Sequence, residues 1–182
     1  MKDLHPDLAR VLISEEAIQG RVTELAQQLA HDYADVERIF LVGILKGAFI
    51  FLADLARQLS KTHSVDFMAL SSYGDTTSST GEVRLIMDLR EPIQDKHVVI
   101  VEDIVDSGHT LKYLYRVLGE RDPASLKTCV LVRKERDSLG VPVDYLGFEI
   151  PDVWVVGYGL DYADCHRTLP FIAELSEHVY AE

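Results

Sequence analysis

Residues 98–111 read VVIVEDIVDSGHTL, and this stretch sets the architecture that is expected for the whole chain. It opens with an apolar run typical of a strand that is buried on both faces. Two acids, Glu102 and Asp103, end that run, and a third, Asp106, follows three residues later. Residues 109–118 then carry apolar side chains at helical spacing. The stretch therefore predicts a strand, a polar turn and a helix, which is the repeating unit of α/β proteins.

The rest of the chain repeats this alternation of strands and helices. Apolar periodicity predicts three helices, at 14–30, 49–59 and 109–118. Continuous or alternating apolar runs predict strands at 39–45, 65–71, 83–89, 97–101, 126–132, 145–150 and 153–156. A chain of 182 residues suits a single domain over 1–182. We therefore expect an α/β fold with a central, mainly parallel sheet flanked by helices.

Composition excludes several classes of protein. The net charge of −12 repels nucleic acid, and the short group Arg133–Arg136 does not form a basic face. No apolar run reaches the length of a membrane span, and the N-terminus lacks the apolar stretch of a signal peptide. The two cysteines, Cys129 and Cys165, form no C-x-x-C pair and are interpreted as reduced thiols. A cytoplasmic protein that binds neither nucleic acid nor membrane is expected.

The acids of the central stretch indicate a ligand site. Ligands of open α/β sheets bind beyond the carboxyl ends of the strands, where Glu102 and Asp103 are expected. Their oxygens suit Mg²⁺ or the hydroxyls of a ribose. Gly108 allows close approach of the backbone to a ligand, and the start of the next helix offers N–H groups to a phosphate. The alternative is an ordinary junction in which Asp106 and Ser107 cap the helix, but three clustered acids at a buried strand are costly without a partner.

A second polar segment, SSYGDTTSSTGE at 71–82, interrupts the order of strands and helices. A long loop in a compact domain is often a functional lid. The alternative is a solvated hairpin tip.

The central stretch resembles the signature that binds phosphoribosyl pyrophosphate (PRPP) in type I phosphoribosyltransferases. Four further segments resemble the hypoxanthine-guanine branch in order and spacing: Leu45–Gly47, Ser71–Gly74, Gly147–Asp152 and Val156–Tyr162. The resemblance implies a small hood built from parts of the N- and C-terminal segments, and a flexible loop over the site. It implies transfer of a phosphoribosyl group from PRPP to hypoxanthine or guanine, with Mg²⁺, by a homodimer or homotetramer.

The resemblance also assigns roles around the sugar. Glu102 and Asp103 would hold the ribose hydroxyls directly or through Mg²⁺, with Asp161 as a further metal ligand. Asp106 would be the general base for the purine. The 5′-phosphate would be wrapped by Asp106, Ser107, Gly108, His109 and Thr110.

The pyrophosphate and the lid take a second group of residues by the same resemblance. Lys46, Gly47 and Arg167 would bind pyrophosphate, and the Leu45–Lys46 peptide would be cis. Ser72 and Tyr73 would be the contact residues of the lid.

Purine recognition would use Lys134, Trp154, Val155 and Asp161. Trp154 would stack on the base, Val155 would offer its backbone, Asp161 would favour the 2-amino group of guanine, and Lys134 would donate to the exocyclic O6. Two alternatives stay open. Counting forward from Asp106 places the family's lysine at Lys134, whereas counting back from Gly147 and Phe148 places it at Arg133. A one-residue deletion in the loop at 135–143 reconciles the two counts. Proteins of this fold also include regulators of pyrimidine operons that bind RNA, although the acidic charge argues against that function here.

Overall fold

The computed structural model describes residues 4–72, 83–135 and 140–181. Its elements follow one another as β1 Leu8–Ile13, α1 Glu15–Asp32, β2 Ile39–Leu45, α2 Phe49–Gln58, β3 His63–Ser72, β4 Val83–Met87, β5 His97–Val105, α3 His109–Gly119, β6 Ser125–Lys134, β7 Tyr145–Ile150, β8 Val155–Val156, β9 Ile172–Leu175 and α4 Glu177–Tyr180.

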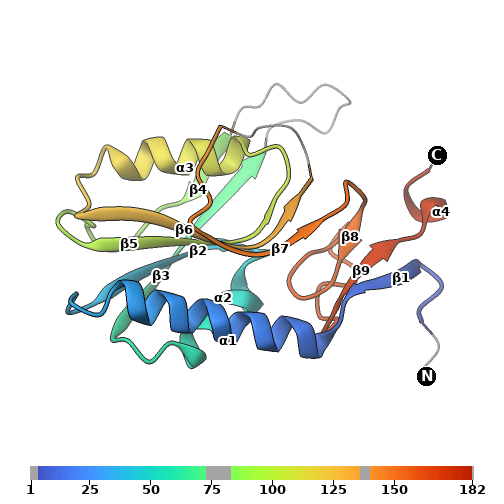
Figure 1. Ribbon diagram of the computed structural model, residues 1–182. Helices are drawn as coiled ribbons and strands as arrows, with labels where there is room; N and C mark the ends of the chain where they lie inside the picture. Colours follow the sequence, from blue (N-terminus) through green and yellow to red (C-terminus); the bar gives the residue numbers. More distant parts are fainter. Residues whose placement is uncertain (1–3, 73–82, 136–139, 182) are drawn as a thin grey trace.

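A six-stranded sheet forms the centre of the molecule, in the order β4-β3-β2-β5-β6-β7. All neighbouring strands are parallel except β3 and β4, which are antiparallel. Helices α1 and α2 cover one face and α3 covers the other (Figure 1). The predicted α/β fold with a central, mainly parallel sheet flanked by helices is therefore confirmed.

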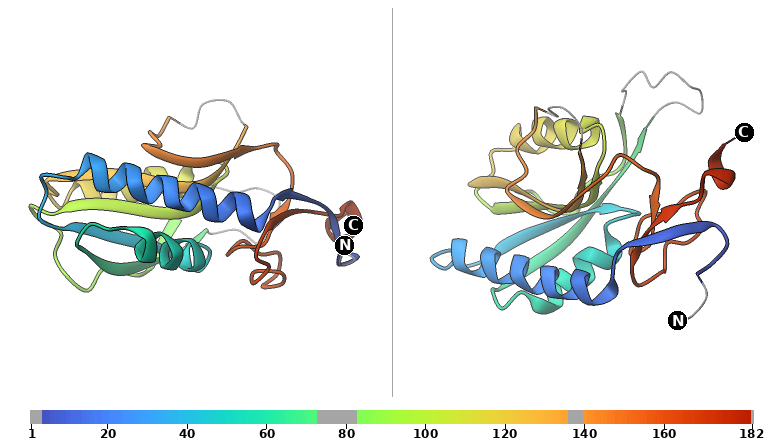
Figure 2. Two further views of the ribbon diagram at one scale, coloured as in Figure 1. Left: turned by 60° about the horizontal axis from the view of Figure 1, so that its bottom comes forward. Right: turned by 45° about the vertical axis from the view of Figure 1, so that its right-hand side comes forward.

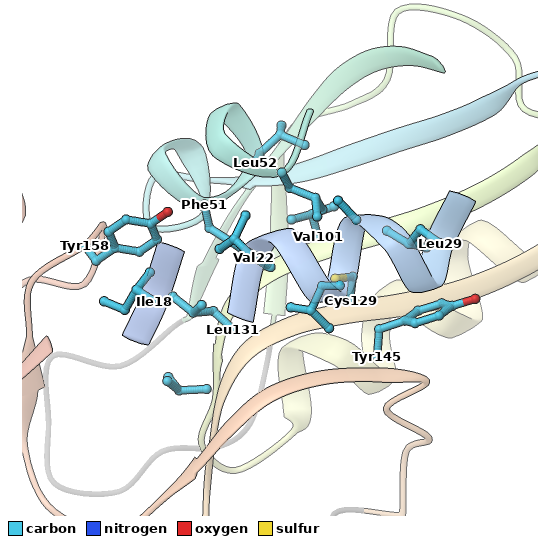
Figure 3. Close-up of a cluster of buried hydrophobic side chains, with 14 of the residues drawn as sticks. Ile18, Val22, Leu29, Phe51, Leu52, Val101, Cys129, Leu131, Tyr145 and Tyr158 are labelled. Carbon is cyan, nitrogen blue, oxygen red and sulfur yellow. The ribbon is translucent and has the colours of Figure 1, made fainter. Parts of the chain in front are cut away.

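The main core lies between α1 and the sheet. Ser14 caps α1, since its hydroxyl accepts a hydrogen bond from the Ala17 N–H at 3.2 Å. The side chains of one helical face are then fully buried and pack against residues of α2, β5 and β6 (Figure 3). Figure 3 shows Ile18 and Val22 of this face close to Phe51 of α2. This packing holds α2, whose first turn begins just after Gly47, in a fixed position on the sheet.

A second, three-stranded sheet lies beyond one end of the first and joins the two ends of the chain. Its order is β1-β9-β8, with Leu8 paired to Leu175 across the molecule. Strand β1 near the start of the chain and helix α4 near its end both lie on this side (Figure 2). Neither β1 nor β9 was predicted, because each is short and gains its partner only when residues about 165 positions apart meet.

Strand β5 extends further than the sequence predicted. The expected end at Val101 is wrong, because β5 continues to Val105 and includes Glu102 and Asp103. Pairing with β2 stops at Val101, whereas pairing with β6 continues to Val105. At Glu102 and Asp103, β5 is therefore still paired with β6 but no longer with β2. A ligand can approach the strand from the side of β2.

Two smaller expectations also need correction. The strand that was expected at 153–156 is confined to Val155–Val156, and it pairs with β9 in the small sheet instead of extending the large one. Strand β4 ends at Met87 rather than at residue 89.

The two cysteines lie in different surroundings. Both cysteines are free thiols, Cys129 in the core and Cys165 exposed. Within the described ranges, no helix combines the length and the apolar character that crossing a bilayer requires.

Candidate active site

Three turns meet where the carboxyl ends of the central strands face the small sheet. An added Cβ on Gly47, just after β2, would lie 1.6 Å from the Asp103 carboxylate of β5. A Cβ on Gly159, in the loop after β8, would lie 2.0 Å from the carbonyl oxygen of Gly47. Only residues without a side chain allow these approaches. Gly159 therefore lets the loop after β8 lie against the turn at the end of β2, and Gly47 lets that turn lie against Asp103 of β5.

Glu102 and Asp103 form a buried pair of adjacent carboxyl groups, each 8% exposed. Burial, followed by the neighbouring charge of Asp103, raises the pKa of Glu102 well above its usual range. Burial also raises the pKa of Asp103 to about 6, although the Ile104 N–H donates to it at 2.9 Å and partly offsets this shift. Ionisation of both groups is costly in this place unless a positive charge joins them.

The turn after β5 leads into α3 without a side-chain cap. Gly108 holds the N-cap position with a φ of +80°, a conformation that favours glycine. Ser107 and His109 are close to one another, with Oγ and Nδ1 2.9 Å apart. Because no side chain makes a capping hydrogen bond to the first turn, the backbone N–H groups at the start of α3 can bind an anion.

Two cations flank the Gly47 turn and share one carboxylate. Lys46 Nζ lies 2.8 Å from Asp164 Oδ1, and Arg167 Nη2 lies 3.0 Å from the same oxygen. Arg167 also contacts Asp161 at 2.6 Å and donates to the carbonyl oxygen of Gly159 at 2.6 Å. The Leu45–Lys46 peptide bond is cis. Lys46, Gly47 and Arg167, which are expected to bind pyrophosphate, thus lie close together. Asp164 lies between the two cations.

A third cation, Lys134, lies on the other side of the acids. It ends β6 beside the end of β5, and its Nζ is 3.4 Å from Asp106 and 3.3 Å from Asp152. Lys134 is 7% exposed, and its ammonium lies 5.7 Å from the centre of the Trp154 ring. Arg133 points elsewhere and pairs with Glu149 at 2.5 Å. Of the two candidates for O6, only Lys134 reaches the side of the sheet that holds Asp106.

Trp154 is the aromatic surface of this region and is 51% exposed. Tyr162 and Tyr180 pack around it, with ring centres 5.8 Å and 5.9 Å away. Val155 follows within β8 and is buried. The half-exposed indole therefore has a supported edge and a free area on which a flat base can stack.

The donors of this region suit a divalent cation. Glu102 Oε2 is buried and has no hydrogen-bond partner among the described residues. Oxygen-only donors at a strand end suit Mg²⁺. Among the residues with described coordinates, His5, Asp7 and His166 are the only three metal-ligand side chains whose donor atoms all lie within 4.8 Å of one another. Asp161 therefore does not complete a single compact shell with Glu102 and Asp103.

The structure brings together most of the residues that the sequence singled out, with one segment left aside. Tyr73 and residues 74–82 of the expected lid lie outside the described residues, and Ser71 and Ser72 end β3. Three acids of the site were not singled out from the sequence: Asp152, Asp164 and Asp54. Asp54 could have been singled out from the sequence, because it is a charged residue within the apolar, buried face of α2.

The sequence matches the phosphoribosyl transferase domain family over residues 13–163. It is 49% identical over 174 residues to the hypoxanthine-guanine phosphoribosyltransferase of Dictyostelium discoideum, covering 93% of this chain and 97% of the relative. It is 47% identical over 167 residues to the hypoxanthine phosphoribosyltransferase of Escherichia coli K12, covering 91% and 94%.

Solved structures agree with these relatives. A hypoxanthine phosphoribosyltransferase from Staphylococcus aureus superposes with a TM-score of 0.92, 43% identity and complete coverage of both chains. The enzyme from Trypanosoma cruzi in complex with its product IMP gives 0.89 and 41%, covering 98% of this chain and 100% of that one. On the family match and the identity to these relatives, this chain belongs to the phosphoribosyl transferase domain family.

Proposed function

We propose that this protein transfers the 5-phosphoribosyl group of PRPP to hypoxanthine and guanine, giving IMP or GMP and pyrophosphate. One observation carries the proposal. The buried pair Glu102 and Asp103 lies between two cationic groups, with Lys46 and Arg167 on one side and Lys134 on the other. A ribose held at the acids would thus have its leaving group on one side and its nucleophile on the other.

The pyrophosphate side stabilises the leaving group. Lys46 supplies a point charge, and the guanidinium of Arg167 offers paired donors that match phosphate oxygens. Arg167 is well placed for this, because its Nη1 is already fixed on the Gly159 carbonyl. Gly47 would contribute its backbone to this site, and its missing Cβ lets the Asp103 carboxylate lie against the same turn. These charges act where negative charge grows as the bond from C1′ to pyrophosphate breaks.

The acids hold the sugar. Glu102 and Asp103 would bind Mg²⁺ or the ribose hydroxyls, with Asp161 as a ligand of a separate ion or of the substrate. Mg²⁺ would neutralise charge on the pyrophosphate and orient it. The raised pKa of Glu102 and of Asp103 supports a cation here, since a positive charge lowers both. The 5′-phosphate would bind at residues 106–110, on the uncapped start of α3.

The purine side supplies a base and a selector. Asp106 would take the proton from N7 of the purine while N9 attacks the ribose, a role that suits a carboxylate beside a ring N–H. Lys134 would donate to O6, which adenine lacks, so that 6-oxopurines are preferred. Trp154 would stack on the ring and Val155 would offer backbone contacts, while Asp161 would favour the 2-amino group of guanine.

Other features of the function follow from the family. The loop at 71–82, with Ser72 and Tyr73, would close over the site and exclude water that otherwise hydrolyses the sugar cation. The small sheet of β1, β9 and β8 would be the hood of a single domain over 1–182. We also propose a cytoplasmic homodimer or homotetramer that binds no nucleic acid and no membrane.

The test is a steady-state comparison of hypoxanthine, guanine, xanthine and adenine with PRPP and Mg²⁺. We expect IMP and GMP formation with hypoxanthine and guanine, and little reaction with adenine. A gel-shift assay with RNA runs beside it. Shifted RNA with no IMP formation would contradict the proposal and favour the regulator of the pyrimidine-operon type.

A further inference from the structure

Asp164 holds both cations of the pyrophosphate side with one oxygen. Its Oδ1 lies 2.8 Å from Lys46 Nζ and 3.0 Å from Arg167 Nη2. These are the distances that a phosphate oxygen would adopt between the same two groups. Without a substrate, the carboxylate of Asp164 therefore stands where an anionic oxygen of pyrophosphate would bind.

The loop that carries Asp164 is built to present it there. Tyr162 and Cys165 exchange backbone hydrogen bonds, so that Ala163 and Asp164 form the tip of a tight turn. Both tip residues have left-handed φ values, +49° and +60°. Asp tolerates this conformation better than most residues, and Asn shares the tolerance. Replacement of Asp164 by Asn therefore keeps the turn and removes only the charge.

Two contacts fix the base of this turn. The Asp164 N–H donates to Asp161 Oδ2 at 2.7 Å, and His166 Nε2 lies 2.8 Å from Asp7 Oδ2 in the N-terminal segment. The tip is thus held close to Lys46 even though the Asp164 side chain is 69% exposed. A tethered carboxylate is present at high effective concentration, so it competes with free anions at little entropic cost.

Charge balance makes this competition relevant. Lys46 and Arg167 carry two positive charges, and Asp161 and Asp164 carry two negative charges beside them. The free pyrophosphate side is therefore neutral. The contact with Asp164 is exposed enough to be displaced, since ion pairs of this kind are weak.

We propose that Asp164 is an internal counter-anion that competes with pyrophosphate for Lys46 and Arg167 and so promotes release of this product. The inference rests on the proposed function, because it takes these two cations as the pyrophosphate site. Asp164 is a positioning residue in this account, since it acts through the two cations and not on the reacting atoms.

The test is calorimetric titration of inorganic pyrophosphate with Mg²⁺ into the full chain. We expect Asp164→Asn to bind pyrophosphate about 3- to 10-fold more tightly than the wild type, the gain that two weak ion pairs allow. Asp164→Glu, which restores the charge, returns the affinity toward that of the wild type. The matched control is Glu120→Gln, which removes one exposed charge at the end of α3, where Glu120 lies 3.9 Å from Arg116.

A double substitution separates competition from a structural effect of the turn. If Asp164 acts through Lys46, the gain from Asp164→Asn shrinks in a Lys46→Met background. An unchanged or weaker affinity of Asp164→Asn, or an equal gain in Glu120→Gln, overturns this inference alone. If the wild type and every variant fail to bind pyrophosphate, the proposed function falls together with the inference.

Discussion

Lys134 places its ammonium 3.4 Å from the carboxylate of Asp106; Lys134 is the last residue of β6, and Asp106 directly follows the neighbouring parallel strand β5. Val105 pairs with Arg133 in the register of β5 and β6, so the residues that follow them, Asp106 and Lys134, lie next to one another at this end of the sheet. The general base and the selector of the proposed reaction are therefore adjacent because of strand register. Lys134 therefore faces Asp106, whereas Arg133 pairs with Glu149.

We expect Lys134→Met to raise the KM for hypoxanthine by about 10-fold or more, since a hydrogen bond from a charged group contributes about 1.5–3 kcal/mol. The control is Arg133→Met, which removes a partly exposed pair with Glu149 and leaves the KM within about 3-fold. Steady-state kinetics with hypoxanthine at saturating PRPP measures both. A larger effect for Arg133→Met would transfer the O6 contact to that residue.

Asp106→Asn tests the general base. The amide keeps the size of the side chain but cannot take the purine proton, so we expect turnover to fall by about 10²- to 10⁴-fold. PRPP binding should change little, because the start of α3 and the acids of β5 remain intact. Single-turnover kinetics and a PRPP titration provide the two readouts. Equal losses in turnover and in PRPP affinity would contradict the assignment.

Acid stability should depend on Asp88 and Arg121. Arg121 donates to both Asp88 oxygens, at 2.8 Å and 2.9 Å, and these hydrogen bonds hold the pKa of Asp88 below its usual value. A lowered folded-state pKa means that the stabilisation is present above about pH 4 and is lost as the pH falls through the folded pKa. Because Asp88 is 44% exposed, screening limits the effect, and we expect Arg121→Gln to cost about 0.5–1 kcal/mol at pH 7.

Urea unfolding at pH 7 and at about pH 3 measures this loss for Arg121→Gln. The difference from the wild type should narrow at the lower pH, where Asp88 becomes protonated. Arg116→Gln is the control, because its pair with Glu120 is exposed and 3.9 Å long. A loss that stays the same at both pH values would show that Arg121 acts through packing instead.

Two glycines make a matched test of site assembly. Gly159 has a φ of +106°, and a Cβ there would meet the Gly47 carbonyl, so Gly159→Ala should lower stability by about 1–3 kcal/mol and raise the KM for PRPP. Gly20 lies in α1, and an added Cβ there meets nothing within 4 Å. Gly20→Ala should instead stabilise the fold by about 0.5–1 kcal/mol with unchanged kinetics. Thermal unfolding and PRPP titration distinguish the two.

Local sequence patterns predicted the central sheet and its helices, because buried strands and amphipathic helices have strong periodic signals. They did not predict β1 and β9, whose pairing depends on the two ends of the chain. They also ended β5 too early, because Glu102 and Asp103 break the apolar run while the pairing with β6 continues.

Within the site, the acids of the central stretch were found because three of them crowd one strand end. Asp164 and Asp152 were not, since a single acid in a loop carries no local signal and its partner lies on a different element. Such contacts are set by register and by loop conformation. The sequence therefore predicts which acids gather at the strand end better than which residues hold the surrounding loops in place.

Tyr158 and Asp54 provide the last test of such holding contacts. The phenol of Tyr158, between Gly157 and Gly159, donates to Asp54 of α2 and so ties the loop after β8 to the helix that begins after Gly47. We expect Tyr158→Phe to cost about 1–3 kcal/mol of stability and to raise the KM for PRPP severalfold, because the loop with Gly159 loosens. Tyr145→Phe is the control, since that buried phenol donates to Asp32 at 2.7 Å, away from the site. Urea unfolding should show a similar loss for both variants, and kinetics should show a changed KM for Tyr158→Phe alone; an equal change in both would mean that Tyr158 contributes only to the fold.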